Sequence, residues 1–281
     1  MNIEEYSSGL STLLQAIRDC SESNGYSISE SVKQLCEERV YIKDEQIQFF
    51  ERIKVVKTVD SATMIHYFSK KNLLGKAREF KLVNDNDYFI LEDRYIVPVY
   101  TINNHLVSLI GWAKGTHDTK YITLPSPYLN KNLDWFALPY ALENYLKLDK
   151  NKYILVVEGI FDALSMNAIG IPTVATMGAD VSYSKTFMLQ PFKRVLYMPD
   201  NDYIGKSNLR KWKFYNVKST SLDLRGEIYL DEDNKEAIIR AKDSDNLASY
   251  LDSEGLKELF LEVAQSNRLN VCLNLNGEIE I

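Results

Sequence analysis

The sequence has few of the residues that build disulfide frameworks, zinc sites or flexible linkers. Its 281 residues include only three cysteines, at positions 20, 36 and 272, and no Cys-x-x-Cys pair. This excludes a zinc ribbon and a disulfide-stapled fold, and we interpret Cys20 and Cys36 as small apolar core residues. The three histidines do not have the spacing of metal ligands. With only 12 glycines and 7 prolines, long disordered linkers are not expected.

Long apolar runs are also missing. No stretch approaches 18 apolar residues, so no segment is expected to cross a membrane. The first ten residues, MNIEEYSSGL, carry acids where a signal peptide needs bases. We therefore expect a cytoplasmic protein with no membrane partner. The length fits one large or two modest domains.

Charge is unevenly distributed. The formal net charge of -6 argues by itself against a nucleic-acid binder. Residues 52–81, however, hold eight Lys/Arg against two acids, and residues 193–213 hold six against two, whereas acids gather in 37–51 and 223–261. Two interpretations stay open: ordinary solvated faces, or a cationic surface beside an acidic pocket.

The first half of the chain reads as mixed helix and strand. Apolar residues at helical spacing predict helices over 7–20, 30–39 and 44–51. The turn signal Asn103-Asn104 separates two β-rich runs and predicts a hairpin of 94–102 with 105–113. A further helix is predicted over 134–149.

From Lys152 onward, short apolar runs alternate with helical segments. Runs at 153–157, 173–176 and 194–198 predict buried strands, and 219–224 predicts a fourth. A helix is predicted after each of the first three strands, the third helix over 208–215, and a further helix is predicted over 246–251. The tail is predicted to end in a strand-like hairpin at Asn276-Gly277. This alternation predicts an α/β fold with a largely parallel sheet.

Acidic side chains follow the predicted strands. Ligands in open parallel sheets bind beyond the carboxyl ends of the strands, where carboxylates would repel one another unless a cation such as Mg²⁺ or Mn²⁺ binds. The candidate metal ligands are Glu158, Asp200, Asp202, Asp243 and Asp245. The glycines that would allow close backbone or phosphate approach are Gly159, Gly178 and Gly205.

Each of these acids has an alternative interpretation when it is taken alone. An Asp-x-Asp pair can be an ordinary acidic turn. Asp243 and Asp245 can cap a helix, and Asp162 can be a first-turn acid. Behind Asp202, the basic residues Lys206, Arg210 and Lys213 share one face of a predicted helix. They are candidates for holding nucleotide phosphates, and a solvated helix face is equally open.

The combination of motifs resembles a known family. VVEGIFDALSMNAIGIPTVATMG, YMPDNDYIG and AKDSDNLASYLDSEGLKELF resemble the TOPRIM domain of bacterial DnaG-type primases. Upstream, LEDRYIVPVY, NNHLVSLIGWAKG and TKYITLPSPYLNKN resemble segments of the same catalytic core. The resemblance covers about residues 30–260. It implies an α+β primase-core subdomain over 1–150, a TOPRIM α/β domain over 151–250, and a short helix and strand-like tail over 251–281.

The resemblance also implies roles for individual residues. Glu158 matches a general acid/base near the metal, and the other four acids match metal ligands, while Gly159 and Asp162 match structural positions. The residues that match positions contacting template or nucleotide phosphates are Arg94, Lys120, Tyr121 and Lys131, with Lys114 where an Arg is usual. Glu92 stands where the family often has an Arg, which removes one positive charge.

The implied activity is that of a DNA primase, which makes short RNA primers on single-stranded DNA from NTPs with Mg²⁺ or Mn²⁺. We expect a minimal core of the kind that phages or plasmids encode, without a zinc-binding domain. A replicative helicase or a zinc-domain protein acting in trans would then be a partner. The alternatives are a TOPRIM nuclease, or a non-catalytic primase-like protein that binds single-stranded DNA or a replication protein.

Overall fold

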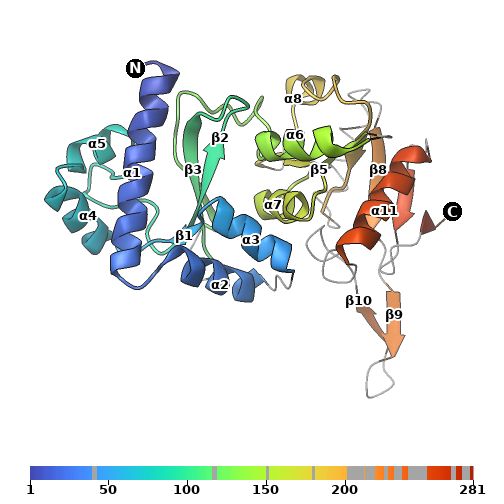
Figure 1. The fold of residues 1–281 in the computed structure, drawn as a ribbon, viewed down its shortest axis with the longest axis horizontal. Helices are drawn as coiled ribbons and strands as arrows, with labels where there is room; N and C mark the ends of the chain where they lie inside the picture. Colours follow the sequence, from blue (N-terminus) through green and yellow to red (C-terminus); the bar gives the residue numbers. More distant parts are fainter. Residues whose placement is uncertain are drawn as a thin grey trace. The chain divides into compact units, whose positions relative to one another are not determined.

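The chain forms two units, Met1–Leu129 and Asn130–Ile281 (Figure 1). The computed structural model describes residues 1–39, 43–115, 119–149, 152–178, 181–200, 212, 219–224, 227–230, 236–239, 252–266, 270–273 and 279–280. No helix within these ranges combines the length and the apolar character that crossing a membrane requires.

Five helices are described in the first unit. They are α1 (Ile3–Ser23), α2 (Ile28–Arg39), α3 (Asp44–Arg52), α4 (Ser61–Lys70) and α5 (Leu74–Glu79). The three helices predicted over 7–20, 30–39 and 44–51 are confirmed. α1 begins earlier than predicted because Asn2 and Glu5 form a reciprocal capping box at its start.

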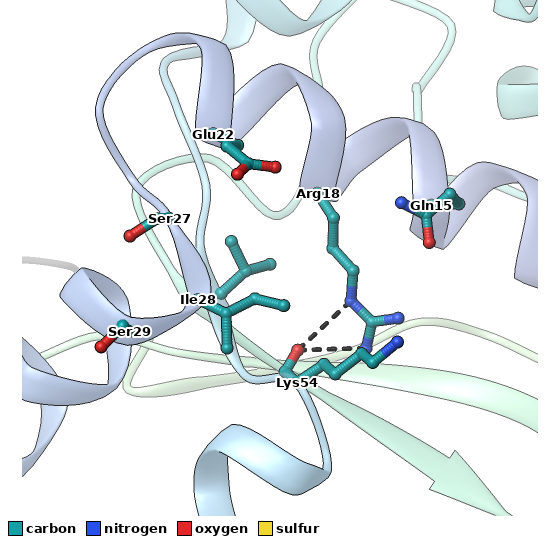
Figure 2. Close-up of a pocket in the computed structure, with 8 residues that line it drawn as sticks. Gln15, Arg18, Glu22, Ser27, Ile28, Ser29 and Lys54 are labelled. Atoms are coloured by element: carbon teal, nitrogen blue, oxygen red, sulfur yellow. Dashed lines mark hydrogen bonds between the residues drawn. The ribbon is translucent and has the colours of Figure 1, made fainter.

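The sheet of the first unit is antiparallel, in the order β1 (Val56–Lys57), β2 (Tyr95–Tyr100), β3 (Leu106–Trp112) and β4 (Tyr121–Thr123). β2 and β3 form the predicted hairpin. The apolar face of α1 packs against β3, where Leu10 and Leu13 share one core with Leu109 (Figure 1). At the other end of α1, Arg18 donates to the carbonyl of Lys54 at 3.3 and 3.0 Å (Figure 2).

The main sheet of the second unit is largely parallel, as the sequence predicted. Its order is β12 (Ile279–Glu280), β11 (Asn270–Leu273), β8 (Ser219–Leu224), β7 (Val195–Tyr197), β5 (Ile154–Val157) and β6 (Thr173–Ala175). All neighbours from β11 to β6 are parallel, and only β12 is antiparallel. The strand-like tail therefore extends the main sheet through β11. A hairpin of β9 (Glu227–Leu230) and β10 (Glu236–Ile239) was not predicted.

The described helices of the second unit are α6 (Leu138–Lys147), α7 (Ile160–Ala168), α8 (Tyr183–Phe187) and α11 (Ser253–Gln265). Buried Asn167 joins three of the elements. Its side-chain Nδ2 donates to the backbone carbonyl of Thr173 at 2.6 Å, and its backbone carbonyl accepts from Nδ2 of Asn144 in α6 at 2.9 Å. α6 lies in this unit together with Phe136, which exchanges backbone hydrogen bonds of 3.1 Å with Ala175. The helices predicted over 208–215 and 246–251 fall outside the described residues, except for Trp212.

Candidate active site

Three neighbouring parallel strands end at the same level. Val156 of β5 pairs with Tyr197 of β7 on one side and with Val174 of β6 on the other. The residues that follow these strands therefore leave the sheet at one edge. Glu158 follows β5 and Asp200 follows β7, while Thr176 begins the turn after β6. We call this the carboxyl edge.

Glu158 and Asp200 both act on the buried hydroxyl of Tyr197. Burial is the main reason why the pKa of Tyr197 is raised, and the negative charges of Glu158 and Asp200 raise it further. Glu158 lies close enough to influence the hydroxyl as an acceptor, but the geometry falls short of a formed hydrogen bond. Both predicted acids therefore lie near enough to Tyr197 for their charges to influence its hydroxyl.

Gly159 and Asp162 fit tightly against each other. Gly159 caps α7, and Asp162 in its first turn is only 6% exposed. A Cβ at position 159 would lie 1.9 Å from Oδ2 of Asp162. The backbone angle φ of Gly159 is -83°, which any residue can adopt, so closeness to the carboxylate requires glycine here.

The carboxyl edge offers the donors that a hard divalent cation takes. Glu158 and Asp200 supply carboxylate oxygens, as Mg²⁺ and Mn²⁺ prefer. Within the described ranges, no group of three His, Cys, Asp or Glu side chains is placed to hold a metal. The remaining predicted residues, Asp202, Gly205, Lys206, Arg210, Lys213, Asp243 and Asp245, lie outside the described residues.

In the first unit, four of the predicted phosphate-binding residues gather at one end of the sheet. Tyr95 pairs with Trp112, and Trp112 pairs with Tyr121, so the residues at and around these three positions lie close together. They are Arg94 before β2, Lys114 after β3, and Lys120 and Tyr121 at the start of β4. We call these four residues the basic cluster.

Within the basic cluster, the cations differ in exposure. The side chains of Lys114 and Lys120 are exposed, whereas Arg94 is only 4% exposed and donates to the carbonyl of Lys120 at 3.3 Å. Burial lowers the pKa of Arg94. The Lys120 ammonium lies 5.5 Å from the centre of the Tyr121 ring. Arg94 thus stabilises the start of β4 through its hydrogen bond to the Lys120 carbonyl. Lys114 and Lys120 carry the charge that is accessible from solution.

Glu92, which stands where the family often has an Arg, has a structural role. Its Oε1 accepts the backbone N–H of Ser61 at 2.7 Å, and its Oε2 accepts the hydroxyl of Tyr88 at 2.5 Å. Ser61 is the first residue of α4, where a carboxylate is favourable. The acid at this position holds the start of a helix.

Sequence reasoning missed Lys185, which is completely buried in α8. Its Nζ donates to the carbonyl of Thr176 at 2.5 Å and to the carbonyl of Lys131 at 2.9 Å. A signal was present, because Lys185 lies four residues after Val181 and four before Leu189, both buried core residues. A lysine in the middle of an apolar helical stripe is unusual.

A pocket of about 300 Å³ in the first unit holds none of the predicted site residues. Arg18 and Lys54 line it together with Gln15, Glu22 and the start of α2 (Figure 2). The Arg18 guanidinium is engaged by the Lys54 carbonyl there. This pocket therefore lies where α1 contacts the segment that follows α3.

Comparisons with known proteins agree with this architecture. Residues 155–220 match the family model described as Toprim-like. A DNA primase of Thermotoga maritima is 32% identical over 117 residues, which span 41% of this chain and 20% of that protein. The match thus covers one fifth of the curated relative's length.

Solved structures extend the likeness to most of the chain. The Escherichia coli primase catalytic core aligns with a TM-score of 0.64 at 17% identity, covering 90% of this chain and 79% of that one. A DnaG primase catalytic domain bound to single-stranded DNA aligns with a TM-score of 0.64 at 16% identity, covering 92% and 83%. The fold is that of the DnaG catalytic core, and the resemblance noted in the sequence is confirmed.

We expect Gly159→Ala to destabilise the second unit by about 1–3 kcal/mol, because the new methyl group would overlap the Asp162 carboxylate. The matched control is Gly178→Ala, since a Cβ at the exposed Gly178 meets nothing within 4 Å. Urea unfolding measures both variants. Equal stability of Gly159→Ala and the wild type would contradict the tight fit.

The stability of the fold should also rise with pH because of Lys185. Burial lowers the pKa of Lys185 to about 7, while Asp134 opposes this shift and Lys131 adds to it. Between this pKa and the ordinary value of 10.5, the unfolded chain binds more protons than the folded one. The free energy of unfolding therefore increases with pH in this window, by at most about 1.4 kcal/mol per pH unit.

Urea unfolding at pH 7 and pH 9 checks this expectation. The increase in the wild type should be larger than in Lys185→Met, which has no titrating amine. Lys193→Met removes an exposed lysine and should keep the wild-type increase. Parallel pH dependence in all three proteins would show that Lys185 titrates as an ordinary lysine.

Proposed function

We propose that the chain is a DNA primase core, which synthesises short RNA primers on single-stranded DNA by metal-dependent nucleotidyl transfer. The observation that carries this proposal is the position of Glu158 and Asp200 at the carboxyl edge, after the neighbouring parallel strands β5 and β7. It occurs within a Toprim-like segment and within the fold of the DnaG catalytic core. The match to the T. maritima DNA primase adds support from sequence.

The reaction joins a ribose 3′-hydroxyl to the α-phosphate of the next NTP and releases pyrophosphate. A bound Mg²⁺ or Mn²⁺ would polarise the phosphoryl oxygens and neutralise charge on the leaving group. Glu158 and Asp200 would hold the ion, joined by Asp202, Asp243 and Asp245. Glu158 would also accept the proton of the attacking hydroxyl, as the family resemblance implies.

The basic cluster would bind phosphates of the template or the nucleotide. Lys114 and Lys120 present exposed charge, and Tyr121 adds a ring beside the Lys120 ammonium on which a base could stack. Arg94 keeps these strand ends together through the Lys120 carbonyl. On the second unit, Lys131, Lys206 and Arg210 would meet the nucleotide triphosphate.

Partners and cellular place follow from the same activity. A primase core works in the cytoplasm on single-stranded template with NTPs. A replicative helicase would deliver that template, and a zinc-domain protein acting in trans would select the start site. Both partners are tested by adding them to the primer-synthesis reaction.

The decisive experiment is primer synthesis by the purified chain. With single-stranded DNA, labelled NTPs and Mn²⁺ or Mg²⁺, we expect a ladder of short RNAs. Glu158→Gln and Asp200→Asn should reduce the ladder about 100-fold or more, because each loses a charged ligand at the reacting centre. Glu143→Gln is the matched control, because Glu143 lies in an exposed ion pair with Lys147 that contributes little.

The same reactions distinguish the alternatives. Cleavage of the DNA that depends on metal and on Glu158 would favour a TOPRIM nuclease. DNA binding without ladder or cleavage, on several templates and with a partner helicase added, would favour a non-catalytic binding protein. Either result would overturn the primase proposal.

The basic cluster makes a separate prediction about binding. Lys120→Ala should weaken binding to single-stranded DNA at all sequences alike, because a phosphate contact carries no sequence information. The slope of log K against log salt should fall by about 0.7, the value for one phosphate contact on a single strand. Fluorescence anisotropy over a salt series measures both quantities. Lys70→Ala removes an exposed lysine of α4 and should leave the slope unchanged, and an unchanged slope in Lys120→Ala would exclude Lys120 from the contact.

A further inference from the structure

Residues 130–136, which precede α6, are attached to the end of β6 at several points. Phe136 and Ala175 exchange two backbone hydrogen bonds of 3.1 Å. The hydroxyl of Ser182 donates to the carbonyl of Asn132 at 2.7 Å, and the indole N–H of Trp135 donates to the carbonyl of Lys185 at 3.0 Å. We call residues 130–136 the edge segment, because these bonds hold it beside the outermost parallel strand.

Lys185 makes the most demanding of these attachments. Its Nζ is buried and bridges the carbonyl of Lys131 in the edge segment and the carbonyl of Thr176 at the end of β6. It also lies 4.9 Å from the centre of the Trp135 ring. Among the described residues it forms no salt bridge, and Asp134 acts only through its charge. A buried amine without an ion-pair partner is costly to the fold, which argues for a role other than stability.

The bridge fixes two backbone points, the carbonyl of Lys131 and the turn after β6. One is Lys131, whose backbone carbonyl accepts a hydrogen bond from Lys185 and whose own side chain is exposed. The other is the turn after β6, where Met177 has a left-handed φ of 59° that side chains adopt at a cost of about 1–2 kcal/mol. Thr176 in this turn also donates through Oγ1 to the carbonyl of Gly178 at 2.7 Å and reaches the carbonyl of Glu158 at 3.5 Å.

A stack of rings connects the same amine to the two carboxylates. Trp135 contacts Trp212 edge to face at 6.4 Å, and Trp212 stacks on Tyr197 at 4.4 Å. The Tyr197 hydroxyl is the group on which Glu158 and Asp200 act. Close-packed interiors have low compressibility and transmit strain, so the ring stack links the edge segment mechanically to Tyr197.

We propose that Lys185 is a positioning residue that fixes the edge segment, and with it the start of the Lys131 side chain, at the carboxyl edge where the nucleotide triphosphate binds. The inference rests on the proposed function for the identity of the ligand. Lys185 itself is buried, so it acts through Lys131 and does not touch the nucleotide. The edge segment then serves as a rigid support for the exposed cationic side chain of Lys131.

Kinetics of primer synthesis test the link between the two lysines. Lys185→Met keeps the length and the apolar contact with Trp135 but removes both hydrogen bonds. We expect it to raise the KM for NTP about tenfold, which is the order of effect when a hydrogen bond between Lys131 and a charged phosphate is lost. The kcat should stay within about twofold of the wild-type value. Lys131→Ala should raise KM similarly. The double variant should be no worse than Lys131→Ala alone, because Lys185 acts through Lys131.

The controls separate positioning from general damage. Lys193→Met loses the same charge from an exposed side chain and should leave KM unchanged. Effects of the two variants that multiply in the double variant would overturn the inference. So would an unchanged KM in Lys185→Met.

Hydrogen exchange tests the attachment without any activity. In Lys185→Met, amides of the edge segment such as those of Asp134 and Phe136, both hydrogen-bonded in the wild type, should exchange at least about tenfold faster, while amides of α11 keep their rates. Ser182→Ala removes the second side-chain attachment from a partly exposed position. If Lys185→Met does not fold, Ser182→Ala serves in its place, and we expect it to accelerate exchange at the same amides.

The two proposals fail in different ways. If the wild type makes no primers but exchange in the edge segment depends on Lys185, the proposed function is wrong and the attachment stands. If primers are made and exchange in Lys185→Met and Ser182→Ala matches the wild type, the positioning role of Lys185 is wrong.

Discussion

The level register of three parallel strands is the constraint on which the candidate active site depends. Because Val156 pairs with Tyr197 and with Val174, residues far apart in the sequence leave the sheet at the same height. Side chains alternate between the two faces of a strand, so a one-residue slip of β7 would turn Tyr197 away from its ring partners and carry Asp200 out of line. β5 and β7 are buried along their whole length, so a slip would exchange side chains between two packed faces and disrupt the packing on both.

Two kinds of charge surround this edge, and the fold treats them differently. The carboxylates lie at the carboxyl edge and are partly exposed, so a cation can reach them. Lys185 is sealed inside, and its protons go to backbone carbonyls. Exposed charge is suited to binding what arrives from solution, whereas buried charge is suited to fixing the chain. The first unit shows the same contrast between the exposed lysines of the basic cluster and Arg94, which is buried and donates to a backbone carbonyl.

Much of this could be predicted from the sequence, because the signals were local. Apolar runs located the parallel strands, and the position of Glu158 and Asp200 directly after them indicated which acids would converge. Three features were missed. The attachment of the edge segment to β6 depends on contacts between residues about 40 positions apart. Lys185 requires knowing that a helical stripe is fully covered. Glu92 read as a lost positive charge, because nothing local shows that α4 begins beside it.

The ring stack has a consequence for how the molecule can be observed. Of the three tryptophans of the chain, two lie in this stack, one against the Lys185 amine and one against Tyr197. Indole emission responds to nearby charge and to ring packing, so the second unit contains an intrinsic optical reporter stacked on the tyrosine that the carboxylates influence. Trp112 stands apart in the first unit, with the Arg39 guanidinium 5.4 Å from its ring. The tryptophans of the two units thus fluoresce in different chemical environments. A cation or a nucleic acid that binds to one unit would change the fluorescence of that unit's tryptophans.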